Sequence, residues 1–133
     1  DLHYPLRRQR QMCIRDSFGL VYYGCCDPLD AKMAEVRLLP NVRKVSMSPW
    51  VNEERGGEAI GGDFVYSRKP SPALVATDVF NPEAVRSDLA ATRKVCEKHG
   101  CPLEFILKDI STVRYEPGRL SQWAAIAMDV AGA

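Results

Sequence analysis

Several features that would each define a class of protein are missing from this sequence of 133 residues. It has no run approaching the roughly 18 apolar residues of a membrane-spanning helix. It has no Gly-x-Gly-x-x-Gly fingerprint of dinucleotide-binding proteins and no Cys-x-x-Cys pair. Charge of one sign is not in excess either, since 18 basic residues stand against 17 acidic residues. We therefore expect neither a membrane protein nor a nucleic-acid-binding protein.

The first 17 residues differ in character from the rest of the chain. Residues 7–16 resemble the translation of a transposase-type sequencing adapter, and such a match is difficult to obtain by chance. The alternative is a basic N-terminal arm or an Arg-rich transit peptide. On the adapter interpretation, residues 1–17 are not native and residues 18–133 form a domain whose N-terminal part is missing. Removing residues 1–17 leaves 14 basic and 15 acidic residues, so the charge balance stays near zero.

The cysteines beyond residue 17 do not indicate a scaffold held together by disulfides. They are Cys25, Cys26, Cys96 and Cys101. Cys25 and Cys26 are adjacent, a geometry poorly suited to a bridge between them, and the cysteine density is low for a small secreted domain. We expect a reduced, cytoplasmic protein.

Strand-like and helix-like segments alternate along the remaining chain. Short apolar or alternating runs predict strands at 18–23, 42–47, 63–67 and 103–107. Apolar spacing and capping signals predict four helices: one opened by Asp27-Pro28, one over about 52–60, one opened by Asn81-Pro82 and closed by Gly100, and one opened by Pro117 with Leu120, Trp123, Ala124, Ala127 and Met128 on its buried side.

This alternation favours an α/β fold with a parallel sheet and helices outside it. Four βα units are half of a (β/α)8 TIM barrel, whose typical size is about 250 residues. With the front of the domain missing, the C-terminal half of such a barrel is the preferred interpretation, and a four-stranded open sheet is the competitor. We expect the complete barrel to be an enzyme and the four units alone to be inactive.

Candidate functional residues gather in the loops after the predicted strands, where βα barrels build their sites. In chain order these loops carry Cys25 and Cys26, then Ser48, then Arg68 and Lys69, and finally Lys108 and Asp109. Each residue type also has a structural interpretation: a buried thiol, a solvated pair of charges, or an ion pair at the barrel mouth.

Three segments of the chain resemble the uroporphyrinogen-decarboxylase-like superfamily. They are residues 22–29 (YYGCCDPL), 41–50 (NVRKVSMSPW) and 103–112 (LEFILKDIST). The resemblance extends from about residue 18 to the C-terminus and implies the last half of that superfamily's (β/α)8 barrel. The superfamily includes porphyrinogen decarboxylases and zinc methyltransferases that move methyl groups between corrinoid proteins and thiols.

For this chain the resemblance implies a modified zinc site. The methyltransferases hold zinc with a His-x-Cys motif after a mid-barrel strand and with a second Cys after the last strand. Here Tyr23 stands in place of the His, Cys25 matches the Cys, and Asp109 lies near the position of the second Cys. Zinc accepts thiolate and carboxylate ligands, so we expect Cys25, Cys26 and Asp109 as its ligands.

A methyltransferase of the corrinoid/thiol type is the first function that the resemblance implies. Its catalytic residues would be Cys25, Lys108 and Asp109. Zinc would be its cofactor, and a partner protein would carry the corrinoid.

Two other functions follow from the same resemblance. One is a decarboxylase or other lyase that acts on a carboxylated tetrapyrrole or small acid, with Arg68, Lys69 and Lys108 pairing with substrate carboxylates. Tyr23 and Ser48 complete the residues that we expect to bind the small-molecule substrate. The last is an inactive homologue or a partner subunit.

Overall fold

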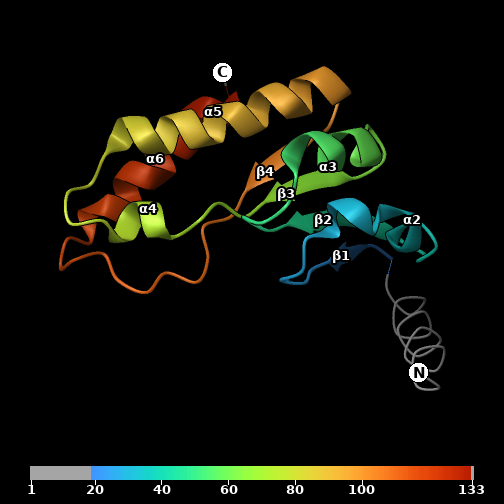
Figure 1. Cartoon of the computed structure of the whole chain (residues 1–133), viewed down its shortest axis with the longest axis horizontal. Coiled ribbons are helices and arrows are strands. Elements are labelled where there is room, and N and C mark those ends of the chain that lie inside the picture. Colours follow the sequence, from blue (N-terminus) through green and yellow to red (C-terminus); the bar gives the residue numbers. More distant parts are fainter. Residues whose placement is uncertain (1–18, 133) are drawn as a thin grey trace.

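A computed structural model describes residues 19–132 of the chain, so the expectation for residues 1–17 lies outside the described residues. Four strands form one all-parallel sheet in the order β1-β2-β3-β4 (Figure 1). They are β1 (Val21–Tyr23), β2 (Val42–Met47), β3 (Val65–Arg68) and β4 (Leu103–Phe105). The predicted α/β class with a parallel sheet is confirmed.

Helical segments connect the strands and follow the last one. They are η1 (Leu29–Ala31), α2 (Met33–Val36), α3 (Glu53–Ile60), α4 (Ala73–Ala76), α5 (Pro82–His99) and α6 (Gly118–Gly132). Within residues 19–132, no helix combines the length and the apolar character that crossing a membrane requires.

The longest helix, α5, forms where local signals predict it. The Asn81 side chain accepts hydrogen bonds from the backbone N–H groups of Glu83 and Ala84, and Pro82 occupies the first turn. Gly100 closes the helix with a φ of 70°, a conformation that glycine adopts without strain. One stripe of the helix is buried, at Val85, Leu89, Thr92 and Cys96.

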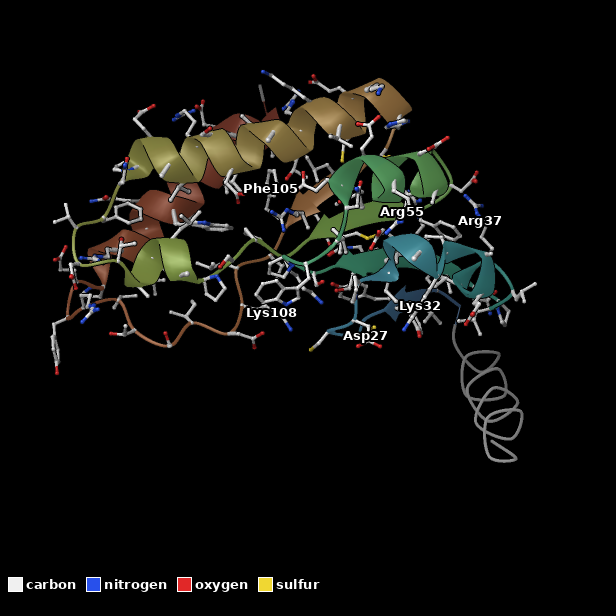
Figure 2. All side chains as sticks on the ribbon, in the orientation of Figure 1. Asp27, Lys32, Arg37, Arg55, Phe105 and Lys108 are labelled. Carbon is white, nitrogen blue, oxygen red and sulfur yellow. The ribbon has the colours of Figure 1, made fainter. Side chains whose placement is uncertain are left out.

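Two shorter helical segments differ from the prediction. The single helix expected after Asp27-Pro28 is instead a 3-10 turn, η1, followed by the one-turn α2. Asp27 does not cap it; its carboxylate pairs with Lys32 at 3.1 Å (Figure 2). The turn α4 lies between the predicted strand at 63–67 and the predicted helix at Asn81, where no helix was expected.

The buried stripe of α6 is rotated from its predicted position. Leu120 and Met128, expected inside, are 38% and 77% exposed, and Ala124 is exposed as well. Ile126 and Val130 are buried together with Trp123. The reason is that α6 packs against both α5 and α4, so its neighbours in space choose the stripe.

The helices form one layer. Helix α3 packs against η1 and α5, and α5 packs against α6. Sequential parallel strands joined by right-handed crossovers place their connecting helices on the same face of the sheet. One core cluster joins β2 and β3 to η1, α2 and α3, and a second joins α4, α5 and α6, against which Phe105 packs (Figure 2).

The two faces of the sheet differ in chemistry. Val45, Met47 and Tyr66 face the helices and belong to the first core cluster. On the other face, the register places Ser46 of β2 beside Ser67 of β3, and Ser67 beside Glu104 of β4. Parallel strands covered on both faces are almost continuously apolar. We call this second, polar side the helix-free face, because the strand residues that pack with the helices, such as Val45, Tyr66 and Phe105, lie on the first face.

Candidate functional site

A pocket of about 220 Å³ lies at the carboxyl ends of the strands. It is lined by Cys26, Ser48, Pro49, Trp50, Lys69, Pro70, Pro72, Lys108 and Asp109. Five of the eight site residues expected from the sequence lie there: Cys26, Ser48, Lys69, Lys108 and Asp109. Loops far apart in the sequence therefore converge as the βα alternation predicts.

Lys69 is the more buried of the two cations that line the pocket. The residue is only 9% exposed, and its backbone N–H donates to the Met47 carbonyl at 2.8 Å, which extends the pairing of β3 with β2. The ammonium lies 5.0 Å from the centre of the Tyr22 ring, within the range of a cation–π contact. Within residues 19–132, no carboxylate lies at ion-pairing distance from it.

Lys108 lies in the loop after β4 (Figure 2) and joins two other pocket residues. Its Nζ is 3.0 Å from Asp109 Oδ2 and 3.9 Å from Cys26 Sγ. The hydrogen bond to Asp109 raises the pKa of Lys108. Asp109 itself has a φ of 56°, a left-handed conformation that is uncommon outside glycine but tolerated by Asp.

An apolar rim borders these charges. The Ser48 Oγ accepts a hydrogen bond from the Trp50 backbone N–H at 3.4 Å. The Trp50 residue is 78% exposed, a large apolar surface beside three prolines of the pocket wall. Exposed aromatic surface at a concave site is typical of ligand binding.

Arg68 lies on the other side of the sheet. It is 4% exposed, and its Nη2 is 2.9 Å from Glu53 Oε1 and 3.4 Å from Asp88 Oδ1. Its Nε donates to Thr92 Oγ1 at 3.1 Å. Arg68 and Lys69 face opposite ways because side chains alternate along a strand. The structure therefore ties Arg68 to α3 and α5 and does not bring it to the pocket.

Two other expected residues are absent from the pocket lining. Tyr23 and Cys25 pack against the first core cluster. The Cys25 thiol points toward the Asp27 carbonyl, with Sγ 3.8 Å from that oxygen. The motif that suggested zinc is thus divided between the core side, with Tyr23 and Cys25, and the pocket, with Cys26.

The residues as placed do not form the expected zinc site. Among residues 19–132, no three His, Cys, Asp or Glu side chains gather around a common point. Cys25 and Cys26 are free thiols, and Cys26 has the Lys108 ammonium as a neighbour. Zinc bound by Cys25, Cys26 and Asp109 stays a prediction, and no chemical step below depends on it.

A hydrogen-bonded chain crosses the helix-free face and takes one residue from each strand. The Tyr22 Oη is 2.9 Å from Ser67 Oγ, and Ser67 donates to Glu104 Oε1 at 2.8 Å. The Lys44 Nζ is 2.6 Å from Glu104 Oε2. Partial burial raises the pKa of Glu104, but hydrogen bonds from Lys44 and Ser67 outweigh it and hold that pKa below its usual value.

The sequence does contain a signal for this chain that strand prediction did not use. Buried parallel strands are expected to be continuously apolar, yet Tyr22, Lys44, Ser67 and Glu104 occupy strand positions. Because side chains alternate between the two faces of a sheet, their positions along the strands place all four on one face. Only the register between strands shows that they are close enough to bond.

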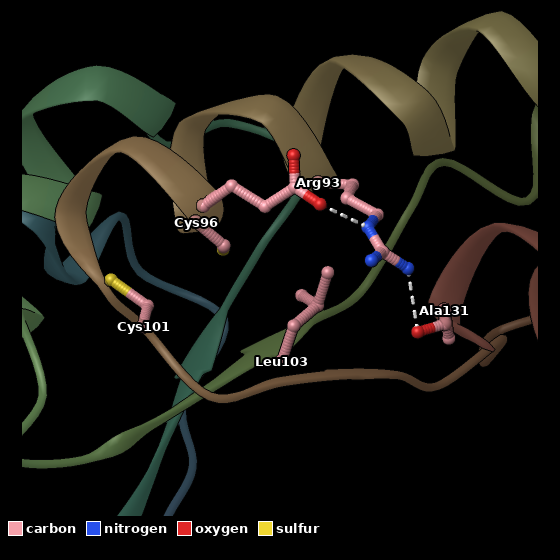
Figure 3. A pocket seen from close by; sticks show the side chains of 6 residues that line it. Arg93, Cys96, Cys101, Leu103 and Ala131 are labelled. Atoms are coloured by element: carbon pink, nitrogen blue, oxygen red, sulfur yellow. Dashed lines mark hydrogen bonds and ion pairs between the residues drawn. The ribbon is translucent and has the colours of Figure 1, made fainter. Parts of the chain in front are cut away.

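A second cavity, of about 190 Å³, lies at the opposite end of the sheet (Figure 3). Its lining includes Cys96, Cys101 and Arg93, and Arg93 donates to the Ala131 carbonyl at 2.7 Å, joining α5 to the end of α6. Burial raises the pKa of the Cys96 thiol to about 12. A thiol that stays protonated is a poor nucleophile.

Comparisons of the chain with protein-family models, with curated proteins and with solved structures found no match.

Proposed function

We propose that this chain is the C-terminal half of a uroporphyrinogen-decarboxylase-like (β/α)8 barrel whose pocket binds and decarboxylates a small carboxylated substrate. Lys69 is the observation that supports this most. It is a nearly buried cation in the pocket wall, and no carboxylate oxygen of the described part of the chain lies within 4.0 Å of its ammonium, since Glu104 is paired with Lys44.

The cost of burying a charge explains why Lys69 indicates a ligand. An ion taken out of water without a partner loses about several kcal/mol of hydration free energy. The Tyr22 ring recovers only part of this, since a cation–π contact contributes about 1–2 kcal/mol. A substrate carboxylate would supply the missing counter-ion. Lys69, Lys108 and Asp109 together give the pocket a net charge of +1, which favours an anion.

The arrangement around Lys69 supports an enzyme of the barrel type. Sequential strand order with one helix layer is the pattern of a (β/α)8 barrel, and such barrels place chemistry at the carboxyl ends of their strands. The pocket of about 220 Å³ is smaller than typical sites for drug-sized ligands, which start near 300 Å³. Its size therefore favours a small acid over a tetrapyrrole.

Methyl transfer to or from a thiol is the second candidate. The Cys26 thiol favours it, because Sγ lines the same pocket, 3.9 Å from the Lys108 ammonium. A corrinoid-carrying partner protein belongs to this candidate and not to the first. The two candidates predict different roles for Cys26, which separates them.

Calorimetric titration of the full-length protein with glutarate tests the first candidate. We expect binding in the wild type and at least a tenfold loss of affinity in Lys69→Met. Lys98→Met removes an exposed cation that pairs with Glu54 on α3, so it should bind glutarate like the wild type. Equal affinity in the wild type and Lys69→Met would contradict the proposal. A methyl group found on Cys26 by mass spectrometry after incubation with methylcobalamin would favour the second candidate.

A further inference from the structure

Tyr22 is placed to reach a ligand that binds Lys69. Its ring lies beside the Lys69 ammonium, 5.0 Å from centroid to Nζ. Lys69 also lines the pocket, so a carboxylate on that ammonium lies next to the phenol. Tyr22 is 42% exposed, which leaves room for a substrate to approach from the helix-free face.

Neighbouring strands fix the direction of the phenol. Because the Ser67 hydroxyl donates its hydrogen to Glu104, its oxygen is left to accept the hydrogen of Tyr22. Lys44 holds the second oxygen of Glu104 at 2.6 Å. Ser67, Glu104 and Lys44 thus form a support that holds the Tyr22 hydroxyl in one place, and they act as positioning residues.

The charges around Tyr22 favour loss of its proton. Partial burial raises the pKa of Tyr22, but Lys69, Ser67 and Ser46 lower it by more, and the net pKa lies below that of an ordinary tyrosine. Lys69, the residue after β3, is the cation beside the phenol, Lys44 is the register partner of Tyr22 on β2, and Glu104 on β4 connects to the phenol through Ser67.

We propose that Tyr22 is the proton donor of this site and delivers the proton that replaces the leaving carboxyl group of a substrate bound at Lys69. The carbon–carbon bond breaks, its electron pair stays on the substrate carbon, and carbon dioxide leaves. The Tyr22 hydroxyl hydrogen turns from Ser67 to that carbon and forms the new C–H bond. The negative charge lost with the carboxylate reappears on the Tyr22 phenolate beside the same Lys69 cation, and water returns the proton afterwards.

This inference rests on the proposed function, since it needs a carboxylate at Lys69. The ionisation of Tyr22 can nevertheless be measured without a substrate. The tyrosinate absorbance of the wild-type full-length protein, minus that of Tyr22→Phe, isolates the titration of Tyr22. We expect its midpoint below that of an ordinary tyrosine, and a higher midpoint in Lys69→Met. Tyr22→Phe keeps the ring beside Lys69 and loses one hydrogen bond to Ser67, so its free energy of unfolding should fall by only about 1 kcal/mol.

Glutarate binding in buffers of different ionisation enthalpy gives the second measurement. A carboxylate on Lys69 screens the cation from Tyr22, so near the Tyr22 midpoint we expect proton uptake on binding in the wild type. Tyr22→Phe should bind glutarate without that uptake. A Tyr22 midpoint equal to that of an ordinary tyrosine, or unchanged proton uptake in Tyr22→Phe, would overturn the role of Tyr22. Unchanged glutarate binding in Lys69→Met would instead overturn the proposed function.

Discussion

Arg68 and Lys69 are neighbours in the sequence and both are nearly buried, yet only Arg68 has carboxylates at ion-pairing distance. Arg68 faces the helices and is neutralised by Glu53 of α3 and Asp88 of α5. Lys69 faces the pocket and the helix-free face, where the described residues offer it an aromatic ring and no carboxylate at ion-pairing distance.

Two successive residues at the end of one strand can therefore have different roles: Arg68 stabilises the fold, and Lys69 is available to a ligand. On the covered face the partners of a charge come from helices of the same chain, so the charge is part of the folded core. On the other face, Lys69 lies 5.0 Å from the centre of the Tyr22 ring, and the nearby Glu104 carboxylate is paired with Lys44 instead. A nearly buried cation without a counter-ion can bind an anionic ligand, because the ligand carboxylate then pairs with the cation.

The largest effect that we expect comes from removing the neutralised cation. Arg68→Met would leave Glu53 and Asp88 without their shared partner and should lower the free energy of unfolding by about 3 kcal/mol. The estimate lies at the low end of the range for buried pairs because both carboxylates reach water. Urea unfolding of the full-length protein, followed by tryptophan fluorescence, measures it.

Lys69→Met is the matched control for that comparison. No ion pair is lost, so the free energy of unfolding should change by less than about 1 kcal/mol, or rise, since an unpaired cation leaves the pocket wall. If Lys69→Met proved as destabilising as Arg68→Met, the contrast between the two faces would be wrong.

The two faces should also differ in how well they tolerate an added methyl group. A Cβ on Gly57 of α3 would lie 2.7 Å from Val95 Cγ1 of α5, so Gly57→Ala should destabilise by about 2 kcal/mol through overpacking. A Cβ on Gly24, near the pocket, would meet nothing closer than Lys69 Nζ at 3.8 Å. Thermal melting of Gly24→Ala should therefore match the wild type, and an equal loss in both variants would contradict this contrast.

The smallest effect should appear at alkaline pH. The pKa of Cys96 is raised to about 12 in the folded protein, against about 8.5 for an ordinary thiol. The unfolded chain releases this proton first, so the stabilisation is complete below about pH 8.5 and declines as pH rises toward 12. The free energy of unfolding should therefore be about 1 kcal/mol lower at pH 9.5 than at pH 7.5.

Urea unfolding at pH 7.5 and pH 9.5 measures this dependence. It should weaken in Cys96→Ala and persist in Cys26→Ser, because Cys26 is exposed. A pH dependence that is identical in the wild type and in Cys96→Ala would remove Cys96 as its source.

Much of the fold follows from local patterns in the sequence. Asn81 and Gly100 bound α5 because an amide cap and a glycine at positive φ satisfy the ends of a helix. Asn52 accepts from the Arg55 N–H and opens α3 in the same way. Helix α6 shows the limit: its buried stripe depends on where α4 and α5 lie, and the sequence of α6 alone misplaced Leu120 and Met128.

The sequence by itself determined four strands, the caps of the long helices and the loops that follow the strands, because these depend on residues close together in the chain. Those loops already contained Cys26, Ser48, Lys69, Lys108 and Asp109. Only the tertiary structure decided which of two adjacent cations meets the helices. It also decided that Tyr22, Ser67 and Glu104 bond to one another, since the register of parallel strands joins residues separated by whole βα units.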